Sequence, residues 1–167
     1  MALCGLTCSP WAEVVSFQSA VDDDCGACAG YAYQLTRWIR DVMNDLACRA
    51  TWCVTADYAG ANHAPEVTVR GGVDVAVAAG ERVVFRADAS DPDGDEVALE
   101  WFRYHEADSY AGEVALEANV AEATLVVPAD ARPGDTIHVV VRVSDESAAD
   151  PRHPYMAAYQ RVVLTVR

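Results

Sequence analysis

The 167-residue chain carries 26 acidic and 12 basic residues, and every basic residue is arginine, so its formal net charge is −14. A surface this acidic repels phosphate groups, which excludes nucleic acid as the expected partner. No stretch is apolar for long enough to predict a membrane span, and the length fits one domain with an appendage. The first residues, MALCGLTCSPWAEVV, contain no readable secretory signal.

All six cysteines lie in the first third of the chain. They are Cys4, Cys8, Cys25, Cys28, Cys48 and Cys53. An even number of cysteines indicates a disulfide framework formed in an oxidising compartment, with the pairing left open. The spacing of the first four also suits a four-thiolate zinc site, and free thiols are the third alternative.

Residues 31–49 show the periodicity of an amphipathic helix. The apolar stripe of this helix consists of Leu35, Trp38, Ile39, Val42 and Leu46. We expect the stripe to pack on the following domain or on a partner. The helix should end before the segment TADYAGANHAPEV, where Gly60 and Pro65 mark a linker. We therefore divide the chain into a cysteine-rich helical appendage with its linker, residues 1–61, and a second domain, residues 62–167.

From Glu66 onward the apolar period changes to two residues, which is the period of a half-buried strand. The alternating runs are EVTV, VDVAV, RVVFRAD, EVALEWFRY, EVALEA, ATLVV, TIHVVVRVSD and QRVVLTV, and turn signals such as AAGE, PDGD and RPGD separate them. Short strands at this spacing predict a mainly β fold, an antiparallel β-sandwich of immunoglobulin-like or cadherin-like type. Trp101 lies midway along a long run, where such sandwiches bury a tryptophan.

The stretch ASDPDGDEV places three carboxylates, Asp91, Asp93 and Asp95, around Gly94. Calcium is coordinated by several hard oxygen ligands, and carboxylates at alternate positions of one tight turn can converge on it. The same residues can instead make an ordinary turn, in which Pro92 and Gly94 reverse the chain and the aspartates cap its backbone. The local sequence leaves both alternatives open.

Four aromatic residues are candidates for stacking on sugar rings: Phe102, Tyr104, Tyr110 and Tyr155. On a strand, Phe102 and Tyr104 share the face opposite Trp101, so they point away from a core that contains Trp101. The alternative is that these rings cover the sandwich or contact a further domain. The histidines and serines form no catalytic constellation, so we expect no enzyme activity from this chain alone.

Three stretches resemble a known family: RWIRDVMNDLACRATWCV, then ANHAPEV, then ASDPDGDEVALEWFRYHEADSYAG with the closing QRVVLTV. They are similar to the C-terminal part of bacterial cellulose-binding proteins, which carry a nucleoside-hydrolase-like domain followed by a cadherin-like sandwich. The resemblance covers residues 31–167 and implies that the helix is the tail of the hydrolase-like domain. The hydrolase activity is not transferred, because the Asp-rich stretch VDDDCGAC lacks the strand that precedes such a cluster in nucleoside hydrolases.

The resemblance implies a secreted or cell-surface accessory module without catalytic activity, which binds a polysaccharide such as a cellulose-like glucan or docks a hydrolase-like domain. One alternative is a calcium-stiffened structural or adhesive repeat that self-assembles, and another is a fragment of a nucleoside-hydrolase-like enzyme. The segment GANHAPEV also resembles the Asn-x-Ala-Pro linker between cadherin-type repeats. This similarity implies that Asn62 meets Asp91, Asp93 and Asp145 around one calcium ion at one end of the sandwich.

Overall fold

The computed structural model describes residues 37–120, 122–146 and 154–167. The chain divides into two compact units, Met1–Met43 and Asn44–Arg167, and the division falls inside helix α3 (Ile39–Trp52). Residues 44–61 therefore belong to the same unit as the strands, whereas the sequence analysis divided the chain after residue 61. The start of the predicted helix and the first four cysteines lie outside the described residues.

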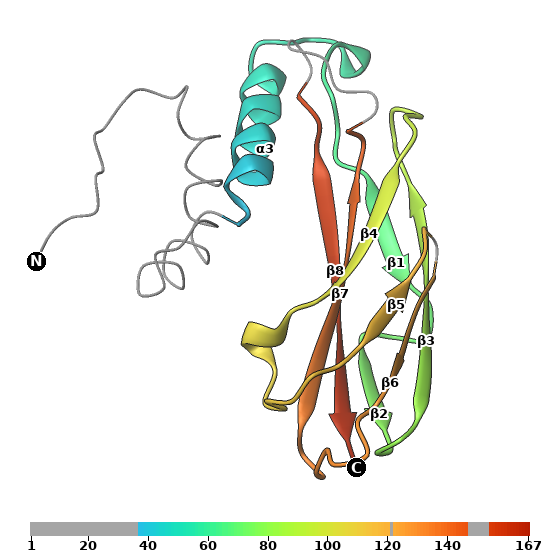
Figure 1. Cartoon of the computed structure of the whole chain (residues 1–167). Helices are drawn as coiled ribbons and strands as arrows, with labels where there is room; N and C mark the ends of the chain where they lie inside the picture. Colours follow the sequence, from blue (N-terminus) through green and yellow to red (C-terminus); the bar gives the residue numbers. More distant parts are fainter. Residues whose placement is uncertain (1–36, 121, 147–153) are drawn as a thin grey trace, which may run out of the picture. The chain divides into compact units, whose positions relative to one another are not determined.

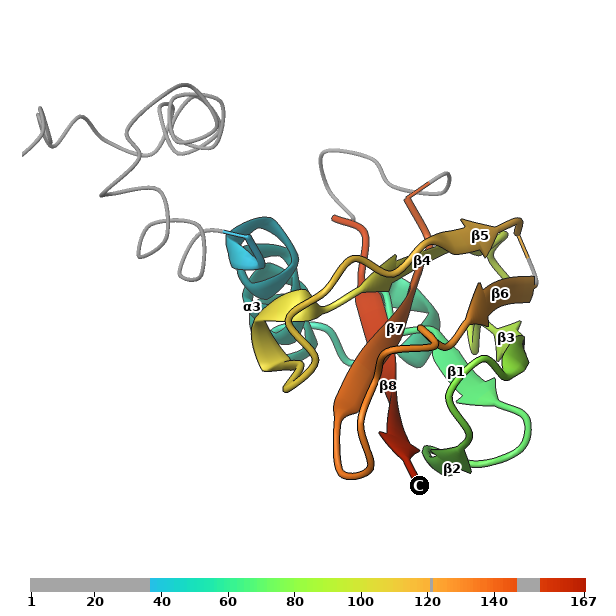
Figure 2. The same ribbon diagram turned by 60° about the horizontal axis from the view of Figure 1, so that its bottom comes forward.

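In the described part of the chain, eight strands form two four-stranded sheets that lie as two layers (Figures 1 and 2). The first sheet has the order β1-β3-β6-β5, with β1 Glu66–Val69, β3 Arg82–Ser90, β6 Glu122–Val126 and β5 Leu116–Ala118. The second sheet has the order β2-β8-β7-β4, with β2 Asp74–Val77, β8 Ala157–Val166, β7 Thr136–Ser144 and β4 Ala98–Arg103.

Among the paired strands, β2 and β8 run parallel and the other pairs are antiparallel. If β1 and β2 count as one edge strand divided between the sheets, the strand order is that of an immunoglobulin sandwich. The predicted mainly β sandwich with a helical N-terminal segment is therefore confirmed, and each predicted alternating run overlaps one strand.

The core lies between the two sheets because each strand directs alternate side chains inward. On β7, Ile137, Val139 and Val141 are fully buried. Trp101 pairs in register with Val141 and packs against Phe85 of the other sheet, with ring centroids 6.0 Å apart. The expected core position of Trp101 is confirmed, and Phe102 consequently lies on the opposite face of its sheet.

Helix α3 buries Cys48, and the Cys48 thiol donates a hydrogen bond to the Pro154 carbonyl oxygen, 3.2 Å away. The side chains of Val42 and Leu46 are exposed, although the sequence placed them in a stripe that should be covered. The face of the helix that meets the sandwich is therefore the one that carries Cys48. In the described part of the chain, no helix is both long enough and apolar enough to cross a membrane.

Candidate functional site

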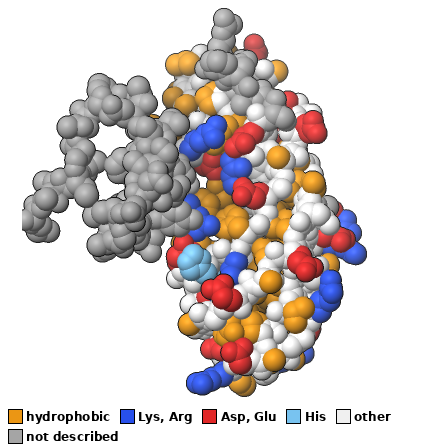
Figure 3. All heavy atoms as spheres, in the orientation of Figure 1, with side chains coloured by type: hydrophobic (Ala, Val, Ile, Leu, Met, Phe, Trp, Pro, Cys, Tyr) orange, Lys and Arg blue, Asp and Glu red, His pale blue; other side chains and the backbone are white. Residues whose placement is uncertain are grey.

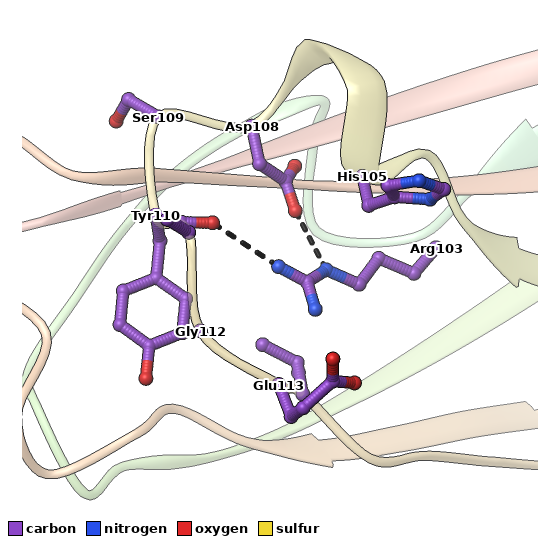
Figure 4. A pocket seen from close by; sticks show the side chains of 9 residues that line it. Arg103, His105, Asp108, Ser109, Tyr110, Gly112 and Glu113 are labelled. Carbon is purple, nitrogen blue, oxygen red and sulfur yellow. Dashed lines mark hydrogen bonds and ion pairs between the residues drawn. The ribbon is translucent and has the colours of Figure 1, made fainter. Parts of the chain in front are cut away.

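A groove of about 490 Å³ opens beside the loop that follows β4 (Figure 4). One continuous stretch lines it: the end of β4, the 3-10 helix η2 (His105–Ala107) and the loop that leads to β5. We call this cavity the loop groove, and its polar lining includes Arg103, His105, Asp108, Ser109, Tyr110 and Glu113. Its volume lies in the range of ordinary small-ligand clefts.

Arg103 is held in place at the inner side of the loop groove. Its Nε donates to Asp108 Oδ2 at 2.6 Å, and its Nη2 donates to the Tyr110 carbonyl oxygen at 3.2 Å. The Asp108 side chain is fully buried, and its other oxygen accepts the backbone N–H of His138 on β7. A guanidinium group has five N–H donors, so Arg103 retains donors beyond these two bonds.

The Tyr110 ring is fixed at one end of the groove by two contacts. Its hydroxyl donates to Asp130 Oδ1 at 2.9 Å, and this hydrogen bond raises the Tyr110 pKa. The ring also lies directly over Gly112, where an added Cβ would come within 2.5 Å of the ring carbon Cζ. Gly112 is therefore required for this ring position, because any side chain there would displace the tyrosine.

A pair of reciprocal hydrogen bonds ties the same loop to the start of β7. The Ser109 backbone N–H donates to Thr136 Oγ1 at 3.1 Å, and the Thr136 backbone N–H donates to Ser109 Oγ at 2.7 Å. Together with Arg103 and Asp108, these bonds hold the loop rigidly. A rigid lining loses little conformational freedom when a ligand binds.

The four aromatic residues predicted to bind sugar lie in different environments. Tyr110 lines the loop groove, whereas Phe102 and Tyr104 are half-buried outside its lining. Tyr155 is only 4% exposed and lies beneath the Arg142 guanidinium group, 5.6 Å from its ring centroid. The prediction for Tyr155 was therefore wrong, because a covered ring has no face to offer a sugar.

Asn62 and Asp145, predicted to meet although they are far apart in sequence, are in contact. Asn62 Nδ2 donates to Asp145 Oδ2 at 2.6 Å and to the Pro154 carbonyl oxygen at 3.0 Å. Asp145 is fully buried, and its Oδ1 accepts the backbone N–H of Met156 at 2.6 Å. Burial raises the Asp145 pKa, and the nearby Asp91 carboxylate raises it further.

The Asp-rich turn also meets the linker, but through His63. The His63 backbone N–H donates to Asp93 Oδ2 at 2.7 Å, and the His63 ring stacks on both Tyr58 and Trp52, with ring centroids 3.7 Å and 5.4 Å away. This stack was not predicted, because the three rings come from a helix end, a 3-10 helix and a linker without a common period.

Asp91 caps the turn, as expected if the Asp-rich stretch is an ordinary turn. Its Oδ1 accepts the backbone N–H groups of Asp93 and Asp95, whereas its buried Oδ2 has no hydrogen-bond partner. Over residues 37–120, 122–146 and 154–167, no group of three or more His, Cys, Asp or Glu side chains is arranged to hold a metal. Calcium binding therefore stays a prediction.

Cys48 and Cys53 are free cysteines in the structure. Burial raises the pKa of the Cys48 thiol, and the nearby carboxylates of Asp145 and Asp45 raise it further, which favours the protonated form that donates to Pro154. The other four cysteines lie outside the described residues, so the disulfide framework and the zinc alternative stay predictions.

Comparison with known proteins identifies a family and a solved structure that this chain resembles. The family model described as cellulose-binding protein Sde0182, C-terminal domain, matches residues 82–166. A solved structure of a nucleoside hydrolase-related hypothetical protein from Saccharophagus degradans, described as associated with carbohydrate metabolism, is 33% identical over 79% of this chain, with a TM-score of 0.71. This chain spans 32% of that protein.

Two further solved structures match with lower TM-scores. A chimeric titin Z1Z2 is 20% identical, with 60% of this chain and 93% of that chain covered and a TM-score of 0.34. AggA, the major subunit of aggregative adherence fimbriae type I from Escherichia coli, is 15% identical, with 64% and 97% covered and a TM-score of 0.37. A search of curated proteins found no match.

Proposed function

Because the chain belongs to the family of the cellulose-binding protein Sde0182 C-terminal domain, we propose that it is a non-catalytic accessory module that binds a polysaccharide through the loop groove. The observation that supports this location of the binding site is the groove itself, in which a fixed aromatic ring lies beside fixed polar groups. We further propose that the module acts outside the cell, in a secreted or surface protein, because polysaccharides of this kind are found there.

The chemistry of the lining suits a sugar. A pyranose ring presents an apolar face, which stacks on an aromatic ring, and a rim of hydroxyl groups, which both donate and accept hydrogen bonds. The loop groove offers Tyr110 for the first interaction, and Arg103 and Glu113 for the second. No catalytic group is needed for this function.

We expect the substitution Tyr110→Leu to weaken polysaccharide binding about fivefold, because one ring stacked on a sugar contributes roughly 1 kcal/mol. Leucine keeps an apolar side chain against the core, so the sandwich should still fold. Affinity electrophoresis through gels that contain cellulose derivatives and related glucans measures the effect.

Tyr159→Leu is the matched control, because the Tyr159 ring is exposed on β8 and does not line the groove. If no polysaccharide in the gel slows the migration of the unsubstituted protein, the proposal is contradicted. That result would favour docking of a hydrolase-related domain, for which the exposed apolar side chains of Leu46, Val54 and Tyr58 are candidate contacts. This chain covers 32% of the nucleoside hydrolase-related protein from Saccharophagus degradans, so the proposed function does not include an activity of that whole protein.

We propose calcium stiffening of the linker as the second candidate function, because the buried Asp91 Oδ2 has no partner and lies near the buried Asp145. A calcium ion would relieve the repulsion between these two carboxylates, with Asp93 and Asn62 as further ligands. Asn62 would then have to present its amide oxygen instead of the nitrogen that now donates to Asp145.

For this second candidate we expect calcium to stabilise the protein by about 2.7 kcal/mol at a free concentration 100-fold above the dissociation constant. Thermal unfolding in excess calcium and in excess chelator measures the difference. Superimposable unfolding curves would show that Asp91, Asp93 and Asp95 serve the turn alone.

A further inference from the structure

From the arrangement of charge in the loop groove, we infer that its ligand is a single uncharged glycan chain and not an acidic polysaccharide or the flat surface of a crystalline glucan. This inference rests on the proposed function, and it adds the ligand class and the binding mode. It depends on four features of the groove and its surroundings: the pairing of Arg103, the position of Glu113, the charge of the rest of the surface and the environment of the exposed aromatic rings.

The positive charge of Arg103 is already balanced inside the protein. Its side chain is only 14% exposed, and its guanidinium group pairs with Asp108, whose side chain is fully buried. An isolated arginine would attract a carboxylate or sulfate on a ligand, but this ion pair presents N–H donors with little net charge. Hydroxyl oxygens of a neutral sugar are suitable acceptors for these donors.

Glu113 supplies the complementary acceptor. In Figure 4 it lies on the opposite side of the Arg103 guanidinium from Asp108, so a ligand in the groove meets donors on one side and a carboxylate on the other. Asp130 adds another negative charge next to the Tyr110 hydroxyl. The groove is thus neutral to negative, and it disfavours a polymer of uronic acids.

The rest of the surface also gives no reason to expect an anionic ligand. The chain has a net charge of −14, and on the face drawn in Figure 3 acidic side chains are interspersed with basic ones and do not gather in one patch. An anionic polysaccharide would therefore be repelled at long range as well as in the groove.

The exposed rings do not suit a flat crystalline surface, which is bound by several rings in one plane. Within the described ranges, the exposed side chains among phenylalanine, tyrosine and tryptophan are those of Tyr58 and Tyr159. One face of the Tyr58 ring is stacked on His63, and the Tyr159 hydroxyl accepts a hydrogen bond from Arg142. These two residues lie in different segments, the 3-10 helix η1 (Tyr58–Gly60) and strand β8, so the groove is the better site for one chain.

The substitution Glu113→Gln tests this inference, with Glu117→Gln as the matched control. Glu113 and Glu117 are both exposed, but only Glu113 lines the groove. We expect Glu113→Gln to weaken binding of a soluble neutral glucan, hydroxyethyl cellulose, about fivefold, because a hydrogen bond to a carboxylate is roughly twice as strong as one to an amide. Glu117→Gln should bind as the unsubstituted protein does, and both variants should keep its melting temperature.

Titration calorimetry and affinity electrophoresis with four probes separate the outcomes: hydroxyethyl cellulose, polygalacturonate, chitosan oligomers and microcrystalline cellulose. Tighter binding of polygalacturonate or of chitosan than of the neutral glucan would overturn the inference. Equal binding by the Glu113 and Glu117 variants would also overturn it, as would retention on microcrystalline cellulose without binding of the soluble chain. In these cases the proposed polysaccharide function survives. If the protein binds none of the four probes, the function and the inference are both contradicted.

Discussion

Replacing Trp101 with alanine is expected to lower the free energy of unfolding by about 4 kcal/mol, because it removes the largest side chain of the core. Trp101 is 7% exposed, lies opposite Val141 in its own sheet and packs against the Phe85 ring of the other sheet. The strands on either side are held by backbone hydrogen bonds and cannot close the cavity that alanine leaves. Urea unfolding followed by far-UV circular dichroism measures the loss.

Trp101→Phe separates the volume of the ring from its polar nitrogen. The Trp101 Nε1 atom is buried without a hydrogen-bond partner, so its removal relieves the cost of an unsatisfied donor while it leaves a smaller cavity. We expect Trp101→Phe to cost about 1.5 kcal/mol or less. A loss as large as that of Trp101→Ala would mean that the indole nitrogen makes a stabilising hydrogen bond in solution. Val126→Ala, at a side chain that is 52% exposed, is the surface control and should change stability by less than about 0.5 kcal/mol.

The strands could be predicted from the sequence because burial of one face of a sheet imposes a period of two residues. Trp101 follows this period and its predicted core position is confirmed, and Val139 and Val141 on β7 are buried with the same period. The turn at Gly94 was also predictable, since its backbone φ of 86° lies in the region that favours glycine. Local rules of this kind depend only on neighbouring residues.

The topology of the sandwich made one long-range contact predictable as well. The linker and the loop after β7 lie at the same end of an immunoglobulin-like fold, and the contact between Asn62 and Asp145 follows from this. The nature of that contact was not predictable. Whether the Asn62 side chain presents an oxygen or a nitrogen to Asp145 depends on its other partners, the His63 backbone N–H and the Pro154 carbonyl oxygen.

The loop groove was only partly predictable, because its loop has no periodic pattern. Tyr110 was selected as an aromatic residue, but nothing local indicates that Arg103 pairs with Asp108 five residues later. The requirement for Gly112 depends on the position of the Tyr110 ring, which Asp130 of a distant loop fixes. Such contacts are set by the packing of β4 against β7, so they appear only in three dimensions.

The second large effect is expected at Asp145, where substitution by alanine should lower the free energy of unfolding by about 3 kcal/mol. This change leaves the Met156 N–H and the Asn62 amide without their acceptor in a fully buried site, and each unsatisfied donor costs roughly 1–3 kcal/mol. Asp95→Ala is the matched control from the same acidic region and should be close to neutral. Equal losses for the two variants in urea unfolding would contradict the assigned role of Asp145.

Asp145 should also give the stability a characteristic dependence on pH. Burial raises its pKa in the folded protein, and Asp91 raises it further, so the folded state binds a proton at a pH where the unfolded state has already released it. The free energy of unfolding then increases as the pH falls through the raised pKa toward the ordinary carboxyl range, and this gain is lost as the pH rises again.

The variant Asp145→Asn cannot titrate at this position, so the difference in stability between the unsubstituted protein and the variant isolates the contribution of Asp145 from that of the other carboxylates. We expect the unsubstituted protein to gain on the variant from pH 7 down to about pH 4. A difference that shrinks over this range would mean that the hydrogen bonds from Asn62 and Met156 outweigh burial and hold the Asp145 pKa below its ordinary value.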